Sequence, residues 1–220
     1  MMEEHYFPTV CVDNFLSDPE KLLKLADTLE YRESTLGVWP GKRTESLHLY
    51  SPEIFASTLS DIFSLFYNYD SESIKWTAEM YFQKTKPYGN LNRGWIHNDL
   101  PNLFSGIIYL NKNGSLSSGT SMYSCIDESK YMKYPMDMKR ELYLNGKVNE
   151  EEYLNEKEMY EKNFVKTTSF GNVYNRMVAY DAKSYHCADG FGGGQDEERL
   201  TLVFFINELK AQTVPLKRNK

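Results

Sequence analysis

Near its C-terminal end the sequence reads Arg199-Leu200-Thr201-Leu202-Val203-Phe204-Phe205-Ile206-Asn207. After the opening arginine this run is almost wholly apolar, and its β-branched and aromatic residues are those that pack well in a buried strand. Further runs with strand character are separated by clusters of Gly, Asn and Ser; they are Trp76–Lys84, Phe104–Leu110, Ser121–Cys125 and Arg176–Asp181. From residue 76 onward the chain is therefore predicted to be rich in β-strands.

Two helical segments come before these strands. After a short predicted strand over Thr9–Phe15, the residues Ser17-Asp18-Pro19-Glu20 supply a cap, an early proline and a first-turn acid, which predict a helix to about Tyr31. A second helix is predicted over roughly Pro52–Tyr67, where apolar side chains recur at helical spacing. The Gly- and Pro-rich segment Gly37–Thr44 between them is predicted to be a loop. Helices followed by strands indicate an α+β layout.

The segment from Asp127 to Phe170 differs in character, because it is dense in Glu, Lys, Met and Tyr. It contains plausible helices near Pro135–Tyr143 and over Glu150–Asn163. Two interpretations stay open: a solvated helical excursion that covers a sheet edge, or a lid over a site. With no internal repeat and no long linker, residues 1–220 are predicted to form a single domain with a helical insertion at about 127–170.

The composition limits the classes of partner. A formal net charge of −6 disfavours bulk nucleic acid, because affinity for phosphates depends on Lys and Arg. The three cysteines form no CxxC pair, so free thiols in a reducing cytosol are expected. No signal peptide and no apolar run of membrane-spanning length is visible, which predicts a soluble, cytoplasmic protein with no membrane partner. The oligomeric state cannot be read from the sequence.

Three residues offer a metal-binding donor set. His97 and Asp99 lie in Trp95-Ile96-His97-Asn98-Asp99-Leu100, and in a strand residues two apart share one face. His186 follows the predicted strand that ends at Asp181. Two imidazoles and one carboxylate are the ligands that non-haem Fe(II) oxygenases use. A lone His-x-Asp is weak evidence for a metal site, since a histidine is more often a polar residue with ordinary hydrogen-bond partners. The metal-site prediction therefore depends on the sequence elements around the motif.

Arg199 is a further candidate functional residue, in this case for binding an anion. It opens the apolar strand and shares a face with Thr201, so the guanidinium and the hydroxyl can together clamp a carboxylate. A solvated charge at the start of a strand is the alternative interpretation. It is disfavoured here because an arginine on the inner face of a buried strand needs an anionic partner.

The order of these elements resembles the Fe(II)/2-oxoglutarate-dependent dioxygenase superfamily, in particular its prolyl-hydroxylase-like branch. The matching features are His97-x-Asp99, a strand ending in Tyr109-Leu110-Asn111, the turn Ser118-Gly119-Thr120, the distal His186, and Arg199-x-Thr201. The resemblance covers roughly residues 76–207, and Val12–Leu16 is similar to the opening of small viral or bacterial members, which allows a viral protein in a host cell. It implies a double-stranded β-helix, a cupin-like jelly-roll barrel, braced by N-terminal helices.

The resemblance also implies roles. His97, Asp99 and His186 would be ligands of Fe(II), and Arg199 would bind the distal carboxylate of 2-oxoglutarate with help from Tyr109 and Thr201. O2 would be the second co-substrate, and ascorbate a supporting reductant. Because Asp99 fills the ligand position that halogenating relatives leave open, hydroxylation of a carbon is the default outcome. The substrate stays open, and a protein residue such as proline or a small molecule would both fit.

The chain departs from the family pattern in a long, glycine-containing gap between His186 and Arg199 and in the 127–170 insertion. Two other functions stay open: a cupin-like metal protein with 2-oxoglutarate-independent chemistry, and a non-catalytic binding barrel. Arg199 and Tyr109 discriminate between the cupin-like protein and the oxygenase, and loss of iron binding in Asp99→Ala would count against the binding barrel. Weaker candidates for substrate contact are Trp39 and Arg43 in the Gly- and Pro-rich loop, whereas Cys187 should point away from the site.

Overall fold

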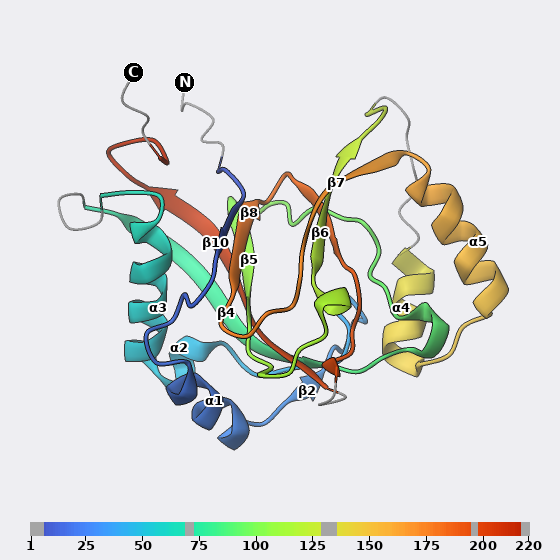
Figure 1. Ribbon diagram of the computed structural model, residues 1–220, viewed down its shortest axis with the longest axis horizontal. Coiled ribbons are helices and arrows are strands. Elements are labelled where there is room, and N and C mark those ends of the chain that lie inside the picture. Colours follow the sequence, from blue (N-terminus) through green and yellow to red (C-terminus); the bar gives the residue numbers. More distant parts are fainter. Residues whose placement is uncertain (1–6, 69–72, 129–135, 195–197, 217–220) are drawn as a thin grey trace.

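The computed structural model describes residues 7–68, 73–128, 136–194 and 198–216. Two antiparallel sheets face each other, with helices at both ends of the molecule (Figure 1). The large sheet has the strand order β1-β8-β5-β10-β4-β3-β2, and the small sheet has the order β7-β6-β9. The predicted α+β jelly-roll-like fold is confirmed.

The strands agree with most of the sequence predictions. Those of the large sheet are β1 (Val10–Val12), β2 (Arg32–Glu33), β3 (Lys42–Arg43), β4 (Lys75–Thr85), β5 (Phe104–Tyr109), β8 (Met177–Asp181) and β10 (Arg199–Lys210). Those of the small sheet are β6 (Thr120–Cys125), β7 (Phe164–Phe170) and β9 (Tyr185–Ala188). The two-residue strands β2 and β3 were not predicted, because a run so short has no periodicity to detect. The segment predicted as a loop thus contains β3, which adds to the sheet edge beside β4.

The strand β10 divides the core in two, because successive side chains of a strand point to opposite faces of the sheet. Leu200, Leu202, Phe204 and Ile206 face the N-terminal helices and belong to the main hydrophobic core. Arg199, Thr201, Val203 and Phe205 alternate with them, and Val203 packs in a smaller cluster between the two sheets. One face of β10 therefore stabilises the domain, and the other faces the space between the sheets.

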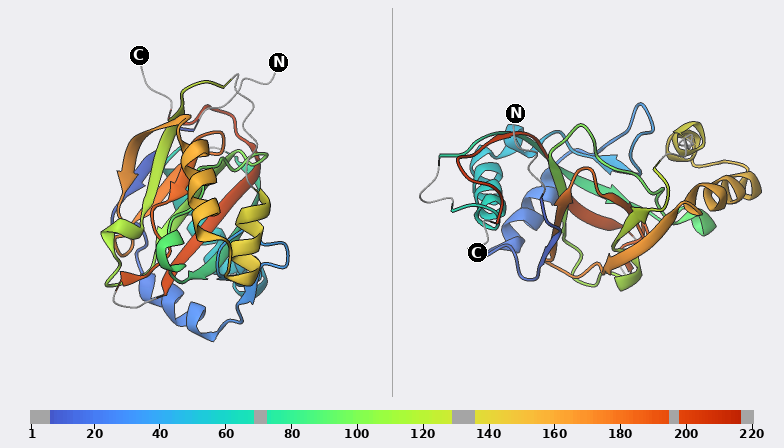
Figure 2. Two further views of the ribbon diagram at one scale, coloured as in Figure 1. Left: turned by 90° about the vertical axis from the view of Figure 1, so that its right-hand side faces the viewer. Right: turned by 90° about the horizontal axis from the view of Figure 1, so that it is seen from above.

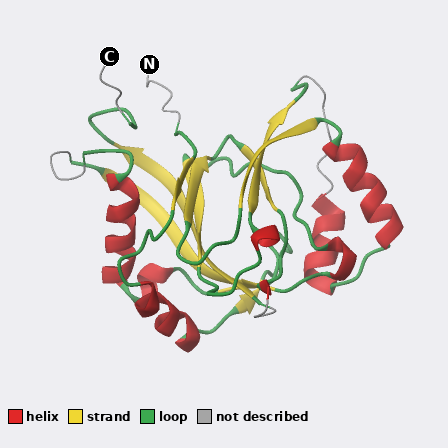
Figure 3. Cartoon of the chain, viewed as in Figure 1, coloured by secondary structure: helices red, strands yellow, loops and turns green. Residues whose placement is uncertain are grey.

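Three helices cover the outer face of the large sheet: α1 (Pro19–Thr28), α2 (Leu47–Tyr50) and α3 (Pro52–Ser64), as Figure 3 shows. The predicted start of α1 is confirmed, because the Asp18 carboxylate accepts a hydrogen bond from the Lys21 amide at 3.2 Å. Ser51 caps α3 in the same way through the Ile54 amide. The apolar stripes of α1 and α3 bury Leu22, Ala26, Leu59 and Ile62 against the sheet.

The 127–170 segment has two helices and a strand in its described part. The helices are α4 (Met136–Asn145) and α5 (Glu150–Glu161), which lie together at the end of the molecule opposite the N-terminal helices (Figure 2). Residues 164–170, for which the sequence predicted no element, form β7 and pair with β6 in the small sheet. Pro135, where the first helix was predicted to begin, lies outside the described residues.

No helix in the described ranges combines the length and the apolar composition that crossing a bilayer requires. Cys11, Cys125 and Cys187 all lie in these ranges, and none of them is in a disulfide, as predicted.

Gly106 should be intolerant of any side chain. It lies in β5 directly opposite Phe204 of β10, and an added Cβ would sit 2.2 Å from Phe204 Cζ and 2.5 Å from the Val178 carbonyl oxygen. We expect Gly106→Ala to lower the free energy of unfolding by about 1–3 kcal/mol through overpacking. Urea denaturation measures this. Gly171→Ala is the matched control, because there the closest atom to an added Cβ is the end of the flexible Leu116 side chain. An equal loss in both variants would contradict the prediction.

Candidate functional site

His97 and His186 are brought together by a backbone bridge between the segment after Trp95 and strand β9. The His97 amide donates to the His186 carbonyl oxygen at 2.9 Å, and the His186 amide donates back to the His97 carbonyl at 2.8 Å. Two residues on, the Asp99 amide donates to the Ala182 carbonyl at 2.9 Å. The segment forms an isolated bridge and not a regular strand, yet the side chains of His97 and Asp99 lie close to each other.

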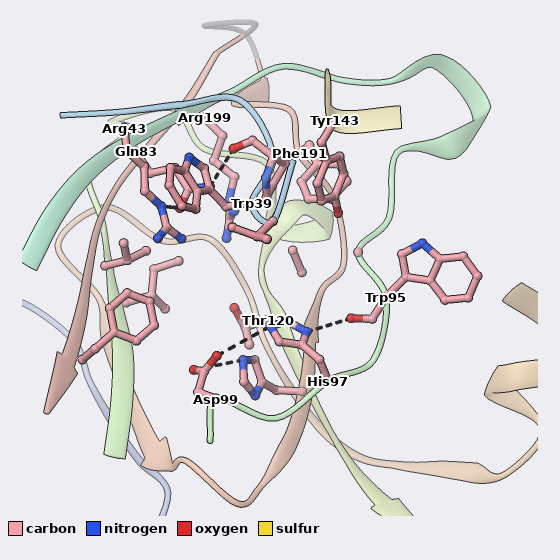
Figure 4. Close-up of a pocket in the computed structure, with 18 of the residues that line it drawn as sticks. Trp39, Arg43, Gln83, Trp95, His97, Asp99, Thr120, Tyr143, Phe191 and Arg199 are labelled. Atoms are coloured by element: carbon pink, nitrogen blue, oxygen red, sulfur yellow. Dashed lines mark hydrogen bonds and ion pairs between the residues drawn. The ribbon is translucent and has the colours of Figure 1, made fainter. Parts of the chain in front are cut away.

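The side chains of His97, Asp99 and His186 come together in a group that could hold a metal ion. Asp99 Oδ1 lies 3.7 Å from His97 Nε2, and Asp99 Oδ2 lies 3.5 Å from His186 Nε2 (Figure 4). One ligand atom from each of the three residues lies within 4.8 Å of the others. A divalent ion placed among them could be bound by two nitrogens and one oxygen on a single side, with other coordination positions left for small molecules.

Hydrogen bonds fix the tautomer of both imidazoles. The Nδ1 atom of His97 lies 2.9 Å from the Trp95 carbonyl oxygen, and that of His186 lies 3.0 Å from the Ser184 carbonyl oxygen. A carbonyl oxygen can only accept, so each Nδ1 carries the proton and donates it. Each Nε2 therefore presents a lone pair toward Asp99, which is the arrangement that outer hydrogen bonds impose on metal-binding histidines.

The charge states also suit a metal. Burial, together with the neighbouring His186 and Lys139, lowers the pKa of His97 to about 3, so its imidazole is neutral near pH 7. For Asp99, burial acts to raise the pKa, but His186 and His97 outweigh it and the pKa is lowered. A neutral imidazole and an ionised carboxylate are the forms that bind metal ions.

A cavity of about 280 Å³ joins this triad to Arg199. Arg199 is 5% exposed, and among the described residues its Nε and Nη2 atoms have no hydrogen-bond partner. Such a group is costly unless an anion pairs with it. Burial lowers the pKa of Arg199, and the nearby Tyr109 opposes that shift. The unsatisfied guanidinium nitrogens therefore point to an anionic ligand in the cavity.

The other two predicted co-substrate residues lie beside Arg199 but are not among the residues that line the cavity. The Arg199 guanidinium carbon is 5.4 Å from the Tyr109 ring centre, and the Tyr109 hydroxyl donates to Thr120 Oγ1 at 2.8 Å. Thr201 is buried on β10 between Tyr109 and Gln83, with its hydroxyl 3.5 Å from the Gln83 carbonyl oxygen. The structure thus brings the triad and Arg199 to one cavity and leaves Tyr109 and Thr201 as supports in its wall.

Several lining residues have no counterpart among the site predictions. They come from the Gly- and Pro-rich loop, β4, α4 and the 190–194 segment, and include Val38, Gln83, Lys139, Tyr143 and Phe191. Figure 4 labels Gln83, Tyr143 and Phe191. Trp39 and Arg43, weaker candidates in the sequence, also line the cavity. Lys139 and Tyr143 lie four residues apart on α4, a spacing that could have placed them on one helix face, although not which face. The cavity is therefore lined by segments far apart in the sequence.

Helix α5 braces the segment that delivers His97. The Lys157 amine donates to the Arg93 carbonyl oxygen at 2.6 Å, and the Tyr160 hydroxyl donates to the Ile96 carbonyl at 2.9 Å. The Trp95 ring packs edge-on against Tyr160. These contacts reach the residues immediately before His97, so α5 supports the metal site from outside, while α4 contributes Lys139 to the cavity wall.

Loss of the Tyr160 hydroxyl should loosen the metal site without touching a ligand. We expect Tyr160→Phe to weaken metal binding by about tenfold, within the range found for outer-shell hydrogen bonds, and to lower the free energy of unfolding by about 1 kcal/mol. Equilibrium dialysis with Co(II) and urea denaturation measure the two effects. Tyr174→Phe is the control, because its hydroxyl bonds Glu20 on the surface. Unchanged metal affinity in Tyr160→Phe would contradict the supporting role.

The fold is that of the 2-oxoglutarate- and Fe(II)-dependent oxygenases, the superfamily that the sequence resembles. Among solved structures, a Trichoplax adhaerens prolyl hydroxylase in complex with a hypoxia-inducible-factor peptide matches with a TM-score of 0.52 at 12% identity, covering 90% of this chain and 83% of that one. HygX from Streptomyces hygroscopicus, with nickel, 2-oxoglutarate and hygromycin B bound, matches with a TM-score of 0.54 at 12% identity, covering 90% and 82%. At these identities the likeness concerns the fold.

The chain belongs to a protein family described as a family of unknown function, DUF6445, whose model matches residues 1–206. No curated protein matches the sequence. The epimerase SnoN in complex with Fe3+, alpha ketoglutarate and nogalamycin RO is a further structural match, with a TM-score of 0.51 at 14% identity, covering 94% of this chain and 81% of that one. Similar folds thus include proteins described as a hydroxylase and as an epimerase.

Proposed function

We propose that the protein is an Fe(II)- and 2-oxoglutarate-dependent oxygenase that hydroxylates a carbon atom of its substrate. The observation that carries this proposal is the cavity that joins a two-histidine, one-carboxylate triad to a buried arginine with unsatisfied nitrogens. Similar folds that are described with metal and 2-oxoglutarate bound support it. The roles given to His97, Asp99, His186 and Arg199 are part of the proposal.

The triad would hold Fe(II) through both Nε2 atoms and the Asp99 carboxylate. When bound, iron supplies the reductive activation of O2 coupled to the decarboxylation of 2-oxoglutarate. In the balanced reaction a substrate C–H group, O2 and 2-oxoglutarate give C–OH, succinate and CO2. The chain itself orients these partners: Trp95 and Ser184 carbonyls hold the imidazoles, and Arg199 fixes the distal carboxylate of the co-substrate. Tyr109 and Thr201 support Arg199 from the cavity wall.

Arg199 favours this function over a 2-oxoglutarate-independent cupin-like activity or a binding barrel. A metal alone would leave two nitrogens of a buried cation without a partner, at a cost of about 1–3 kcal/mol or more. A five-carbon dicarboxylate that reaches from the metal to Arg199 removes this cost. The triad and the arginine are therefore best explained by one co-substrate that touches both.

Anaerobic titration of the protein with Fe(II) and 2-oxoglutarate tests the proposal. We expect a visible metal-to-ligand charge-transfer band that requires both additions, followed by slow succinate formation when air is admitted, with ascorbate sustaining turnover. Fe(II)-loaded protein that binds no 2-oxoglutarate would refute the co-substrate assignment, and the alternative activities would then be preferred. Stimulation of succinate release identifies substrates among amino acids, peptides containing proline and other small molecules.

A further inference from the structure

The cavity holds more positive charge than the proposed co-substrate needs. Arg43, Lys139 and Arg199 all line it, and Asp99 is the only carboxylate among the described lining residues. If the proposed function holds, a divalent metal, Asp99, the 2-oxoglutarate dianion and Arg199 together carry no net charge. Arg43 and Lys139 add two further cationic side chains to the wall that a second ligand would meet.

Arg43 is held in place by its neighbours. Its Nε donates to Gln83 Oε1 at 3.0 Å, and the Gln83 amide donates to the Pro40 carbonyl oxygen at 2.8 Å. The guanidinium carbon stacks 4.7 Å from the Trp39 ring centre (Figure 4). Among the described residues the two terminal amines of Arg43 make no hydrogen bond. A guanidinium fixed through Nε presents these amines as a paired donor for a carboxylate or phosphate.

Lys139 comes from the insertion and is buried to 8% exposure in the same cavity. Its pKa is lowered to about 8, mainly by burial and further by Arg43, although Asp99 favours the charged form. Burial also lowers the pKa of Arg43, to about 10, and the charges of Asp99, Tyr81 and Glu79 oppose this pKa shift. Arg43 thus lies close enough to Lys139 to act on its charge, and an anionic ligand that meets both side chains would offset their repulsion.

The size of the cavity sets a limit on the ligand. About 280 Å³ must hold both 2-oxoglutarate and the reacting part of the substrate, and this volume lies at the small end for ligand sites. Trp39, Tyr143 and Phe191 add aromatic surface to the cavity wall (Figure 4), and the Trp39 ring lies against Arg43. A small molecule with a compact apolar part and one anionic group fits these dimensions better than a folded macromolecule.

We propose that Arg43 and Lys139 form the subsite for an anionic group, a carboxylate or a phosphate, of a small-molecule substrate. This inference rests on the proposed function and specifies its substrate class. The insertion thereby contributes a specificity residue through α4, in addition to the support that α5 gives to His97.

Binding to the full chain loaded with Ni(II) and 2-oxoglutarate tests the proposal, because nickel permits no turnover and the co-substrate occupies Arg199. The probes are benzoate, phenyl phosphate and the neutral isostere benzamide, titrated by ligand-observed NMR. We expect both anions to bind at least about tenfold more tightly than benzamide. The comparison of benzoate with phenyl phosphate shows whether the subsite prefers a carboxylate or a phosphate. Lys139→Met and Arg43→Gln should each weaken anion binding by about tenfold, equivalent to about 1.4 kcal/mol.

Arg140→Gln, on the exposed side of the same helix, is the matched control and should leave anion binding unchanged. Benzamide binding as tightly as benzoate, anion binding that 2-oxoglutarate displaces, or full binding by both subsite variants would overturn the subsite. Absence of binding by both anions to protein that retains 2-oxoglutarate would overturn it as well. Binding of 2-oxoglutarate is measured in the same samples, so its failure would count against the proposed function and not against the subsite alone.

Discussion

Asp99→Ala is expected to reduce metal affinity at the triad by at least about 100-fold and to abolish 2-oxoglutarate turnover. Asp99 lies between the two Nε2 atoms and is the only carboxylate among the described residues that line the cavity. Without it, only the two imidazoles remain, and no ligand of the triad offsets the charge of a divalent ion. The loss should exceed the roughly 10- to 100-fold effect of removing an outer-shell partner. Anaerobic equilibrium dialysis with Fe(II) measures the affinity.

Two comparisons make this result interpretable. Asp27→Ala removes a solvent-exposed carboxylate on α1 and should leave metal binding unchanged. Circular dichroism should show that Asp99→Ala still folds, because its carboxylate belongs to the cavity and not to the main hydrophobic core. Wild-type metal content in a folded Asp99→Ala protein would rule out the proposed triad.

Arg199→Met is expected to raise the Kd for 2-oxoglutarate by about 100-fold or more while Fe(II) binding is retained. The guanidinium is buried, and loss of one partner from a buried charge pair costs about 2–5 kcal/mol. Isothermal titration of the metal-loaded protein measures the affinity. Arg140→Met, at an exposed position on α4, should bind 2-oxoglutarate like the wild type.

Arg199→Met should not destabilise the protein in the absence of ligands. Arg199 has two buried nitrogens with no hydrogen-bond partner among the described residues, and methionine occupies a similar volume without that desolvation cost. The free energy of unfolding of the unliganded protein should therefore stay equal or increase. A protein that loses both stability and 2-oxoglutarate affinity would indicate a structural role for Arg199 instead of co-substrate binding.

The main strands and the N-terminal helices could be predicted because each is encoded locally. The alternation along β10 separates Leu200 and Leu202, in the main core, from Val203 between the sheets. Caps at Asp18 and Ser51 mark the starts of α1 and α3 within a few residues. By contrast, β7 could not be predicted: it follows a helix-rich stretch, its side chains are largely exposed, and only pairing with β6 shows that it is a strand.

The residues of the candidate site can be separated in the same way, into those predicted from the local sequence and those brought together by long-range pairing. The local sequence was enough to predict the candidate donors His97 and Asp99, which share a face of any extended segment. It also predicted Arg199 as a candidate anion-binding residue, because Arg199 opens an apolar run. The pairing of His186 with His97 and the packing of Thr201 between Tyr109 and Gln83 depend on the folded chain. The same holds for Lys139 of α4, which lines the same cavity as Arg43. The physical reason is that local periodicity fixes the face on which a residue lies, whereas its partner depends on long-range pairing that no short segment encodes.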